Sequence, residues 1–217
     1  MRLPFTHEQF LDLFGTYNTA LWPFAALLWL VTVAALVALF RQRLAPRLAA
    51  ALLAVHWAWS AGYHLVYFAT INPAARLFGA LFLLQAALFL WLAVRGAGLA
   101  VGRGHSPHQI LSAVFCAYAV LYPFLALATG LRWPRMPAFG VPCPTTLLTV
   151  GLLLGLAPKR QRGLSVIPFL WCLVGGSASV ALCIRPDLML LVGALILVLY
   201  ALAPSVLGGR SVQPAEA

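Results

Sequence analysis

The sequence predicts an all-α fold: a polytopic bundle of about seven transmembrane helices, preceded by an N-terminal amphipathic interfacial helix. Hydrophobic residues make up 63% of the 217 residues and charged residues only 8%. A soluble domain has roughly 45–50% and about 25% of these classes, so this chain has too few polar residues to cover a water-exposed surface. Its apolar residues form successive runs near the roughly 20 residues that a helix needs to cross a bilayer. We therefore expect a single membrane domain over residues 1–217, with the lipid bilayer as its surroundings.

Residues 1–18 are predicted to form a short helix that lies in the membrane interface. Thr6 is a favourable N-cap, Gln9 completes a capping box, and Phe5 is spaced to form a hydrophobic staple with Phe10. Two opposite faces follow, with Phe10, Leu13, Phe14 and Tyr17 on one and Glu8 and Asp12 on the other. Such segregation favours a helix on the membrane surface over one that crosses it.

Seven apolar segments follow, and we expect each to be a helix. Their predicted bounds are 20–40, 48–69, 76–97, 109–130, 142–156, 164–183 and 187–207. The fifth is the shortest and opens with a proline. Short segments of this kind lie inside a bundle or begin below its surface, and they often border binding sites in transporters.

The basic residues predict the orientation of the chain in the cell membrane, because short cytoplasmic loops are enriched in Lys and Arg. The segments after the first, third, fifth and seventh spans carry Arg41, Arg43, Arg47, Arg95, Arg103, Lys159, Arg160, Arg162 and Arg210. The opposite loops carry Arg2, Arg76, Arg132, Arg135 and Arg185, partly offset by Glu8, Asp12 and Asp187. We expect the N-terminus outside, the C-terminus inside, and a flexible cytoplasmic tail over 208–217. The formal net charge of +10 is thus an orientation signal, and no nucleic-acid partner is expected.

The stretch 132–149 concentrates polar residues and prolines between two apolar segments, and we expect the other informative polar residues to gather around it. The candidate substrate-binding residues are Glu8, His64, Asn72, Arg76, Arg135, Cys143, Thr145 and Thr146. Glu8 and Asp12 are expected to pair with Arg76 or Arg135, since an arginine close to lipid is usually paired. The pair is either a latch that seals the loops or a clamp for an anion or substrate.

His64 lies within a span, where an ionisable group is a candidate ligand or proton relay; the alternative is a neutral histidine bonded to a neighbouring helix. Cys143 stands at a helix N-terminus near Arg135, so we expect it to be the reactive, water-accessible thiol. A packed, inert cysteine and a disulfide with Cys183 are the alternatives. Cys116 and Cys172 are expected to pack within spans.

Small residues at 175–179 predict close packing of two membrane helices. The alternative is that the hydroxyls of Ser177 and Ser179 line a polar cavity. No Ser-His-Asp order, paired carboxylates, HxxxH or phosphate loop is present, so the known intramembrane hydrolase and kinase patterns are unsupported and no catalytic residue is predicted. The sequence leaves the identity of any cofactor or metal open.

The chain also resembles a family of seven-span bacterial membrane proteins catalogued as a domain of unknown function. The stretches that carry the resemblance are Pro4-Phe5-Thr6, Glu8-Gln9-Phe10, Tyr63-His64, Ile71-Asn72-Pro73-Ala74-Ala75, Phe78-Gly79, Pro134-Arg135-Met136-Pro137, Phe139-Gly140, Pro142-Cys143-Pro144-Thr145-Thr146 and Gly175-Gly176-Ser177-Ala178. The resemblance implies a family of membrane proteins, some of which are loosely labelled permease, and it brings no established catalytic residues.

These observations favour a small-solute permease or channel-like transporter, with a small molecule or ion as its substrate and an outward-facing polar site. Two alternatives from other classes stay open. One is a membrane-embedded enzyme or thiol- or metal-binding sensor that uses Cys143 and His64. The other is a structural accessory subunit of a membrane complex.

Overall fold

The computed structural model describes residues 4–96, 98–99, 101, 105–156, 158–203 and 206, apart from the side chains of residues 158 and 159. The roles expected for Arg2, Arg103, Arg210 and the tail 208–217 lie outside these residues. The described chain is all-α. Its helices are α1 (His7–Phe40), α2 (Pro46–Gly62), α3 (Ala75–Val94), α4 (Pro107–Ala128), α5 (Pro142–Leu153), α6 (Pro158–Ala181) and α7 (Met189–Leu202).

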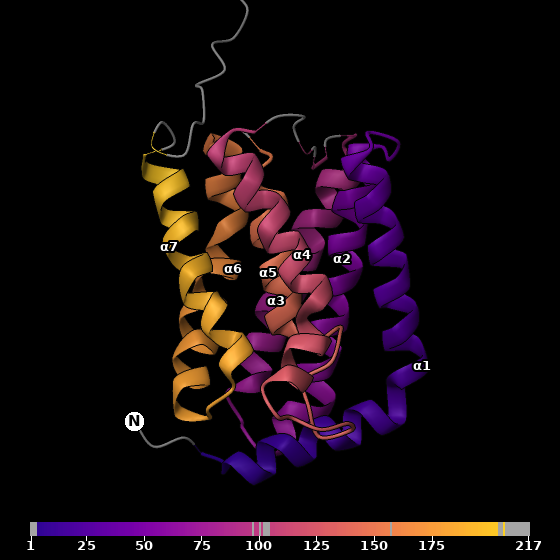
Figure 1. The fold of residues 1–217 in the computed structure, drawn as a ribbon, viewed down its shortest axis with the longest axis vertical. Coiled ribbons are helices and arrows are strands. Elements are labelled where there is room, and N and C mark those ends of the chain that lie inside the picture. The colour runs from indigo at the N-terminus through magenta and orange to yellow at the C-terminus, as the bar shows by residue number, and fades with distance from the viewer. Residues whose placement is uncertain are drawn as a thin grey trace, which may run out of the picture.

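These helices form one bundle and run alternately between its two ends (Figure 1). Within the described residues, five segments are long and apolar enough to cross a membrane. They are His7–Phe40, Ala75–Val94, Pro107–Ala128, Arg160–Ala181 and Arg185–Leu202. Many large apolar side chains on the outside of the bundle are exposed, among them Leu83, Leu90 and Leu195. This outer surface is compatible with contact to lipid, because lipid tails are as apolar as these side chains.

The first helix differs from the prediction. A separate interfacial helix over 1–18 and a span over 20–40 were expected, but α1 is continuous over 34 residues and contains Pro23. Proline lacks the N–H that a helix interior uses and bends the helix. The first part of α1 lies across one end of the bundle, and the rest runs along the bundle (Figure 1). We call this the N-terminal end.

The local signals at the start of α1 are confirmed. The Thr6 side chain accepts from the Gln9 backbone N–H, and the Gln9 side chain accepts from the Thr6 N–H. The rings of Phe5 and Phe10 stack with centroids 5.7 Å apart. The acidic residues Glu8 and Asp12 are exposed, whereas Phe14 on the opposite face is buried.

The second predicted span ends in an irregular helix. After α2 the chain continues as a π-helix, η1 (Tyr63–Tyr67), and then as a 3-10 helix, η2 (Phe68–Thr70). π-Helical turns are rare and often lie at functional sites. This one carries His64.

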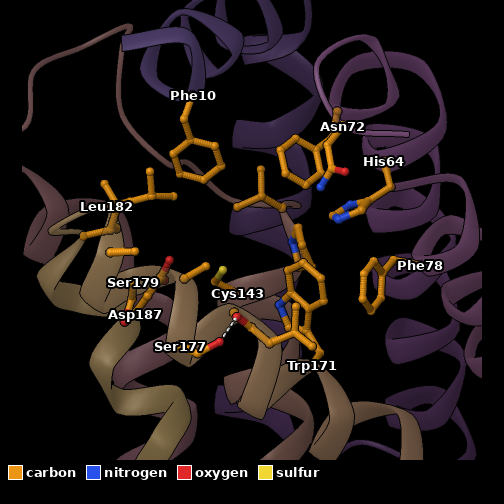
Figure 2. Close-up of a pocket in the computed structure, with 18 of the residues that line it drawn as sticks. Phe10, His64, Asn72, Phe78, Cys143, Trp171, Ser177, Ser179, Leu182 and Asp187 are labelled. Atoms are coloured by element: carbon orange, nitrogen blue, oxygen red, sulfur yellow. Dashed lines mark hydrogen bonds between the residues drawn. The ribbon is translucent and has the colours of Figure 1, made fainter. Parts of the chain in front are cut away.

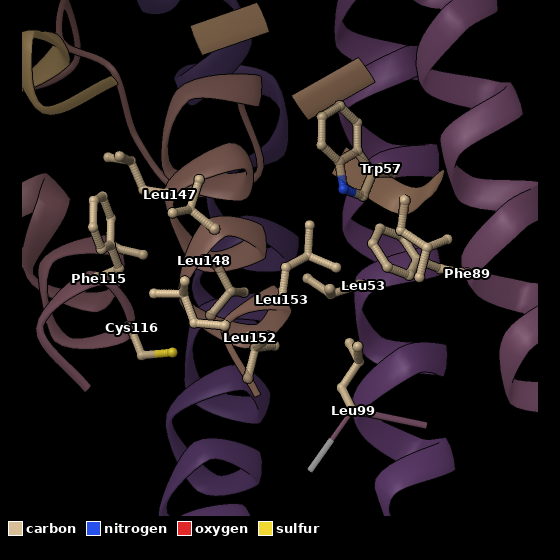
Figure 3. Packing of buried hydrophobic residues seen from close by; sticks show 14 of the residues in the cluster. Leu53, Trp57, Phe89, Leu99, Phe115, Cys116, Leu147, Leu148, Leu152 and Leu153 are labelled. Carbon is tan, nitrogen blue, oxygen red and sulfur yellow. The ribbon is translucent and has the colours of Figure 1, made fainter. Parts of the chain in front are cut away.

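The fifth segment is confirmed as a short helix inside the bundle, although it ends at Leu153 rather than near residue 156. All 12 residues of α5 are buried. Leu147, Leu148, Leu152 and Leu153 pack in a core with side chains of the surrounding helices, including Trp57, Phe89 and Phe115 (Figure 3). Since α5 is surrounded by other helices, its first turn places Cys143 inside the bundle rather than at its surface.

Small residues hold α6 and α7 close together, as predicted. A Cβ atom added at Gly176 would lie 2.6 Å from Leu191 Cδ2, and one at Gly175 would lie 3.0 Å from Leu190 Cδ1. The distance at Gly176 is shorter than real Cβ contacts, and the distance at Gly175 is at their lower limit. The small residues thus let the two helices approach closely, and a larger residue at Gly176 would displace the Leu191 side chain.

Candidate functional site

The loop between α4 and α5 is anchored by side chains of α1 and α2. The Asn18 amide donates to the carbonyls of Pro134 and Met136, at 2.6 and 2.7 Å. The Tyr17 hydroxyl donates to the Phe139 carbonyl at 3.0 Å, and the Ser60 hydroxyl donates to the Gly140 carbonyl at 2.9 Å. The stretch that the sequence singled out is therefore held against the bundle by its backbone oxygens.

A cavity of about 170 Å³ lies at the N-terminal end (Figure 2). Its wall comes from the first part of α1, from η1 and η2, from α3, from the first turn of α5, and from α6 and the 3-10 helix η3 (Arg185–Leu188). Aromatic side chains form much of this wall: Phe5, Phe10, Phe14, Tyr63, Phe68, Phe78 and Trp171. We call this the aromatic wall. The cavity is large enough for several water molecules or a small ligand.

Three polar atoms of buried residues in the cavity wall have no hydrogen-bond partner. They are Tyr63 Oη, His64 Nε2 and Trp171 Nε1, of which the last lies beside the Cys143 thiol, a weak acceptor. The three residues are 4%, 1% and 7% exposed, respectively. Buried polar groups nearly always have a partner, and an unsatisfied one costs about 1–3 kcal/mol. All three atoms belong to residues that line this one cavity.

The proton on His64 can be assigned from its contact. Nδ1 lies 3.3 Å from the Ser60 carbonyl oxygen, which only accepts, so Nδ1 carries the proton. In the neutral ring Nε2 is then an acceptor with a free lone pair. His64 thus offers a hydrogen-bond acceptor to the cavity, while the Trp171 indole offers a donor.

Asp187 is the functional candidate that the sequence analysis did not select. It is 5% exposed, lines the cavity, and its Oδ1 accepts a short hydrogen bond from the Tyr122 hydroxyl. The Cys143 thiol lies beside its carboxyl group. One signal was present in the sequence: Asp187 is one of only four acidic residues and stands at the start of an apolar segment.

The expected ion pair is formed by Arg135. Its Nη2 lies 2.5 Å from Glu8 Oε2 and its Nε lies 2.8 Å from Asp12 Oδ1. The hydrogen bond to Glu8 raises the pKa of Arg135. All three residues are exposed, and exposed pairs contribute little to stability, about 0–1 kcal/mol. The pair links the first turn of α1 to the loop after α4 and lies outside the cavity.

The remaining candidates divide between the surface, the core and the cavity. Arg76 is exposed, and no hydrogen bond or ion pair of its side chain occurs among the described residues. The buried Thr145 hydroxyl lies 3.1 Å from the Ser60 hydroxyl, and the Thr146 hydroxyl is buried without a partner. Neither threonine lines the cavity, whereas His64, Asn72 and Cys143 do. The predicted site is thus three separate groups in the structure.

The expectations for the cysteines are corrected. Cys143 and Cys183 are both free, so the disulfide alternative is wrong. Cys143 is buried, 8% exposed, while Cys183 is exposed. Arg135 is engaged by Glu8 and Asp12, and the charged group beside Cys143 is Asp187. Cys143 is buried because it lies in the first turn of α5, which is inside the bundle.

Thiol labelling tests this correction. A bulky, water-soluble maleimide applied to the purified protein in detergent should label Cys183, because only an accessible thiol can meet such a reagent. We expect Cys183→Ser to remove most of the label and Cys143→Ser to leave it nearly unchanged, as measured by intact-protein mass spectrometry. Cys116→Ser is the control for a buried thiol. A loss of label in Cys143→Ser alone would contradict the structure.

Ser177 and Ser179 belong to the small-residue stretch at 175–179, for which packing and a role in a polar cavity were both considered. Both residues line the cavity, yet Ser177 donates to the Val174 carbonyl and Ser179 to the Gly176 carbonyl of their own helix, at 2.9 and 2.6 Å. The two hydroxyl donors are therefore satisfied, and the hydroxyl oxygens can still accept a hydrogen bond from a ligand. Among the described residues no group of three His, Cys, Asp or Glu side chains is placed to hold a metal ion.

These features define an all-α bundle with several apolar helices able to cross a membrane and a cavity that holds a buried carboxyl group. The chain belongs to the family of unknown function DUF6064, whose model matches residues 7–209. Comparisons with curated proteins and with solved structures gave no match.

Proposed function

We propose that this protein is a seven-span membrane protein with its N-terminal end outside the cell and its C-terminus in the cytoplasm. In this arrangement α2 with η1 and η2, and the short α5, complete the set of spans begun by the five long apolar segments. The distribution of arginine supports the orientation. Arg41, Arg43, Arg47, Arg95, Arg160 and Arg162 lie at the end opposite the start of α1. The first part of α1 would lie in the outer interface.

We further propose that the protein is a small-solute permease, with the cavity as its outward solute site. The observation that carries this proposal is the set of three unpartnered polar atoms, on Tyr63, His64 and Trp171, around a cavity that also holds a buried carboxyl group. Ionisable residues at membrane depth are costly, and they mark substrate and ion pathways. A solute that bonds to these atoms offsets their cost only while it occupies the cavity.

The first part of α1 has the position of an outer gate. Phe5, Phe10 and Phe14 contribute to the cavity wall, while Glu8 and Asp12 on the same segment hold the loop after α4 through Arg135. Release of this exposed ion pair costs little, so the main cost of moving the segment away from the cavity is the exposure of its buried apolar side chains, among them Leu11 and Phe14. A solute would then enter from the outer side.

A thiol- or metal-binding sensor is the second candidate, because His64 and Cys143 line the same cavity. This alternative predicts that a soft metal ion protects Cys143 from small thiol reagents. Transport predicts flux whether or not the thiol is present, so Cys143→Ser separates the two candidates.

Flux into proteoliposomes tests the permease proposal. Uptake of a panel of sugars, polyols, amino acids, small amines and monovalent ions is compared with that of protein-free liposomes. We expect at least one solute class to enter faster with protein. Trp171→Phe keeps an aromatic ring but removes the unpartnered donor, and the loss of one hydrogen bond, about 1.4 kcal/mol, should slow that flux about tenfold.

Trp91→Phe is the matched control, since Trp91 is exposed on the outside of α3 and does not line the cavity. It should leave flux unchanged. If no solute in the panel enters faster than in protein-free liposomes, or if both tryptophan variants lose flux equally, the cavity is not a transport site.

A further inference from the structure

We infer that the cavity binds a small organic amine in its protonated form, with the ammonium group at Asp187 and an apolar body against the aromatic wall. This inference rests on the proposed function in one respect, that the cavity is the solute site. It adds the chemical class of the solute.

Asp187 is a buried acid without a basic partner among the described residues. Its carboxyl group contacts Tyr122 and lies beside Cys143, and both groups are donors that carry no positive charge. Arg185, two residues earlier, is exposed, and no ion pair joins it to Asp187. A buried carboxylate is normally paired with a cation. A cationic ligand in the cavity would supply the missing charge.

The aromatic wall suits a cation that carries an apolar group. Aromatic ring faces attract ammonium groups, and the same rings favour contact with hydrocarbon. Figure 2 shows Trp171, Phe78 and Phe10 around the cavity, with Cys143 near the middle of the view and Asp187 beside Ser179.

Other ligand classes fit less well. An anion would meet the Asp187 carboxyl group with no Lys or Arg side chain in the described wall to compensate for it. A metal ion such as Ca²⁺ prefers six to eight oxygen ligands, whereas the wall is mostly aromatic and aliphatic. A sugar needs many hydrogen-bond partners along its whole surface. An amine with an apolar body needs polar partners at one end only, which matches the cavity.

Binding of three ligands of similar size tests the inference without any transport measurement. Phenethylamine, 2-phenylethanol and phenylacetate share an aromatic body and differ in charge. Isothermal titration to the purified protein in detergent, corrected by titration into detergent alone, should show phenethylamine binding at least about tenfold more tightly than the other two. Equal affinities for the amine and the alcohol in the unaltered protein would overturn the inference.

Three variants test whether the preference for the amine comes from the Asp187 carboxyl group. Asp187→Asn should remove the preference for the amine, while Asp187→Glu, which keeps the charge, should retain it. Asp12→Asn removes an exposed acid outside the cavity and should leave binding unchanged. A preference that survives in Asp187→Asn also overturns the inference. If this variant does not fold, the comparison of the three ligands on the unaltered protein and on Asp187→Glu still decides.

The two proposals fail in distinguishable ways. Flux of a solute without any preference for amines would leave the permease proposal standing and overturn the ligand class. Amine binding that depends on Asp187, without flux of any solute, would overturn transport and support the ligand class.

Discussion

Gly140→Ala should cost the protein most of its folded yield in detergent. Gly140 has a φ of +90°, and an added Cβ would lie 2.6 Å from Trp59 Nε1 and 2.9 Å from Tyr17 Oη. The substitution therefore combines backbone strain with a clash against the bond from Trp59 to the Tyr17 hydroxyl, which is 2.7 Å long. Strain and clash together should destabilise the fold by about 3 kcal/mol or more. This effect is measured by thermal unfolding, with the folded fraction monitored by fluorescence-detected gel filtration.

Gly130→Ala separates strain from clash. Gly130 has a similar φ of +96°, but an added Cβ would meet nothing within 4 Å. We expect a loss of only about 1 kcal/mol, the cost of the backbone conformation alone. Equal losses in the two variants would mean that the contacts of Gly140 with α1 and α2 do not hold the loop.

Gly151→Leu should separate α5 from α4 and has the second-largest expected effect. Even a Cβ at this position would lie 2.8 Å from Cys116 Sγ and 2.9 Å from the Ser112 carbonyl oxygen. The oxygen belongs to the backbone of α4, so only a movement of the whole helix makes room. Overpacking of this kind costs about 1–3 kcal/mol and sometimes more, and we expect the upper end.

Gly62→Ala is the control for this variant, because Gly62 is helical and a Cβ there meets nothing within 4 Å. Its stability should stay within about 1 kcal/mol of the unaltered protein, since alanine favours a helix over glycine. Unfolding by a graded mixture of denaturing and mild detergent compares the two. A loss in Gly62→Ala as large as that in Gly151→Leu would show that the α4–α5 contact is not the cause.

Much of the fold follows from local patterns. The capping box of Thr6 and Gln9 and the pairing of Phe5 with Phe10 depend on residues three to five positions apart, and both are present as predicted. The helix bounds follow from apolar runs, whose length is set by the medium that they must cross. The continuity of α1 through Pro23 could not be predicted, because a proline can end a helix or merely bend it, and the contacts of the first turns with the bundle decide between them.

The site could be predicted only in part. His64, Asn72 and Cys143 do line one cavity, but Arg135 with Glu8 forms a surface ion pair and Thr145 lies in the core. The position of a residue along the chain does not tell how deeply its side chain is buried in the helix bundle. Cys143 and Cys183 show this most clearly: the first stands at the start of α5 and the second just after the end of α6, yet only Cys143 is buried.

The sequence by itself determined the helical, membrane-compatible class of this protein, the order of its apolar helices, and the residues that cap and anchor the first of them. These properties depend on composition and on short-range periodicity, which can be read from residues that are close together in the sequence. The tertiary structure alone decided that Asp187 meets His64, Trp171 and Cys143 around one cavity, since these residues come from four separate segments. The partners of a buried polar group depend on which helices pack side by side, and helix packing is a property of the whole bundle.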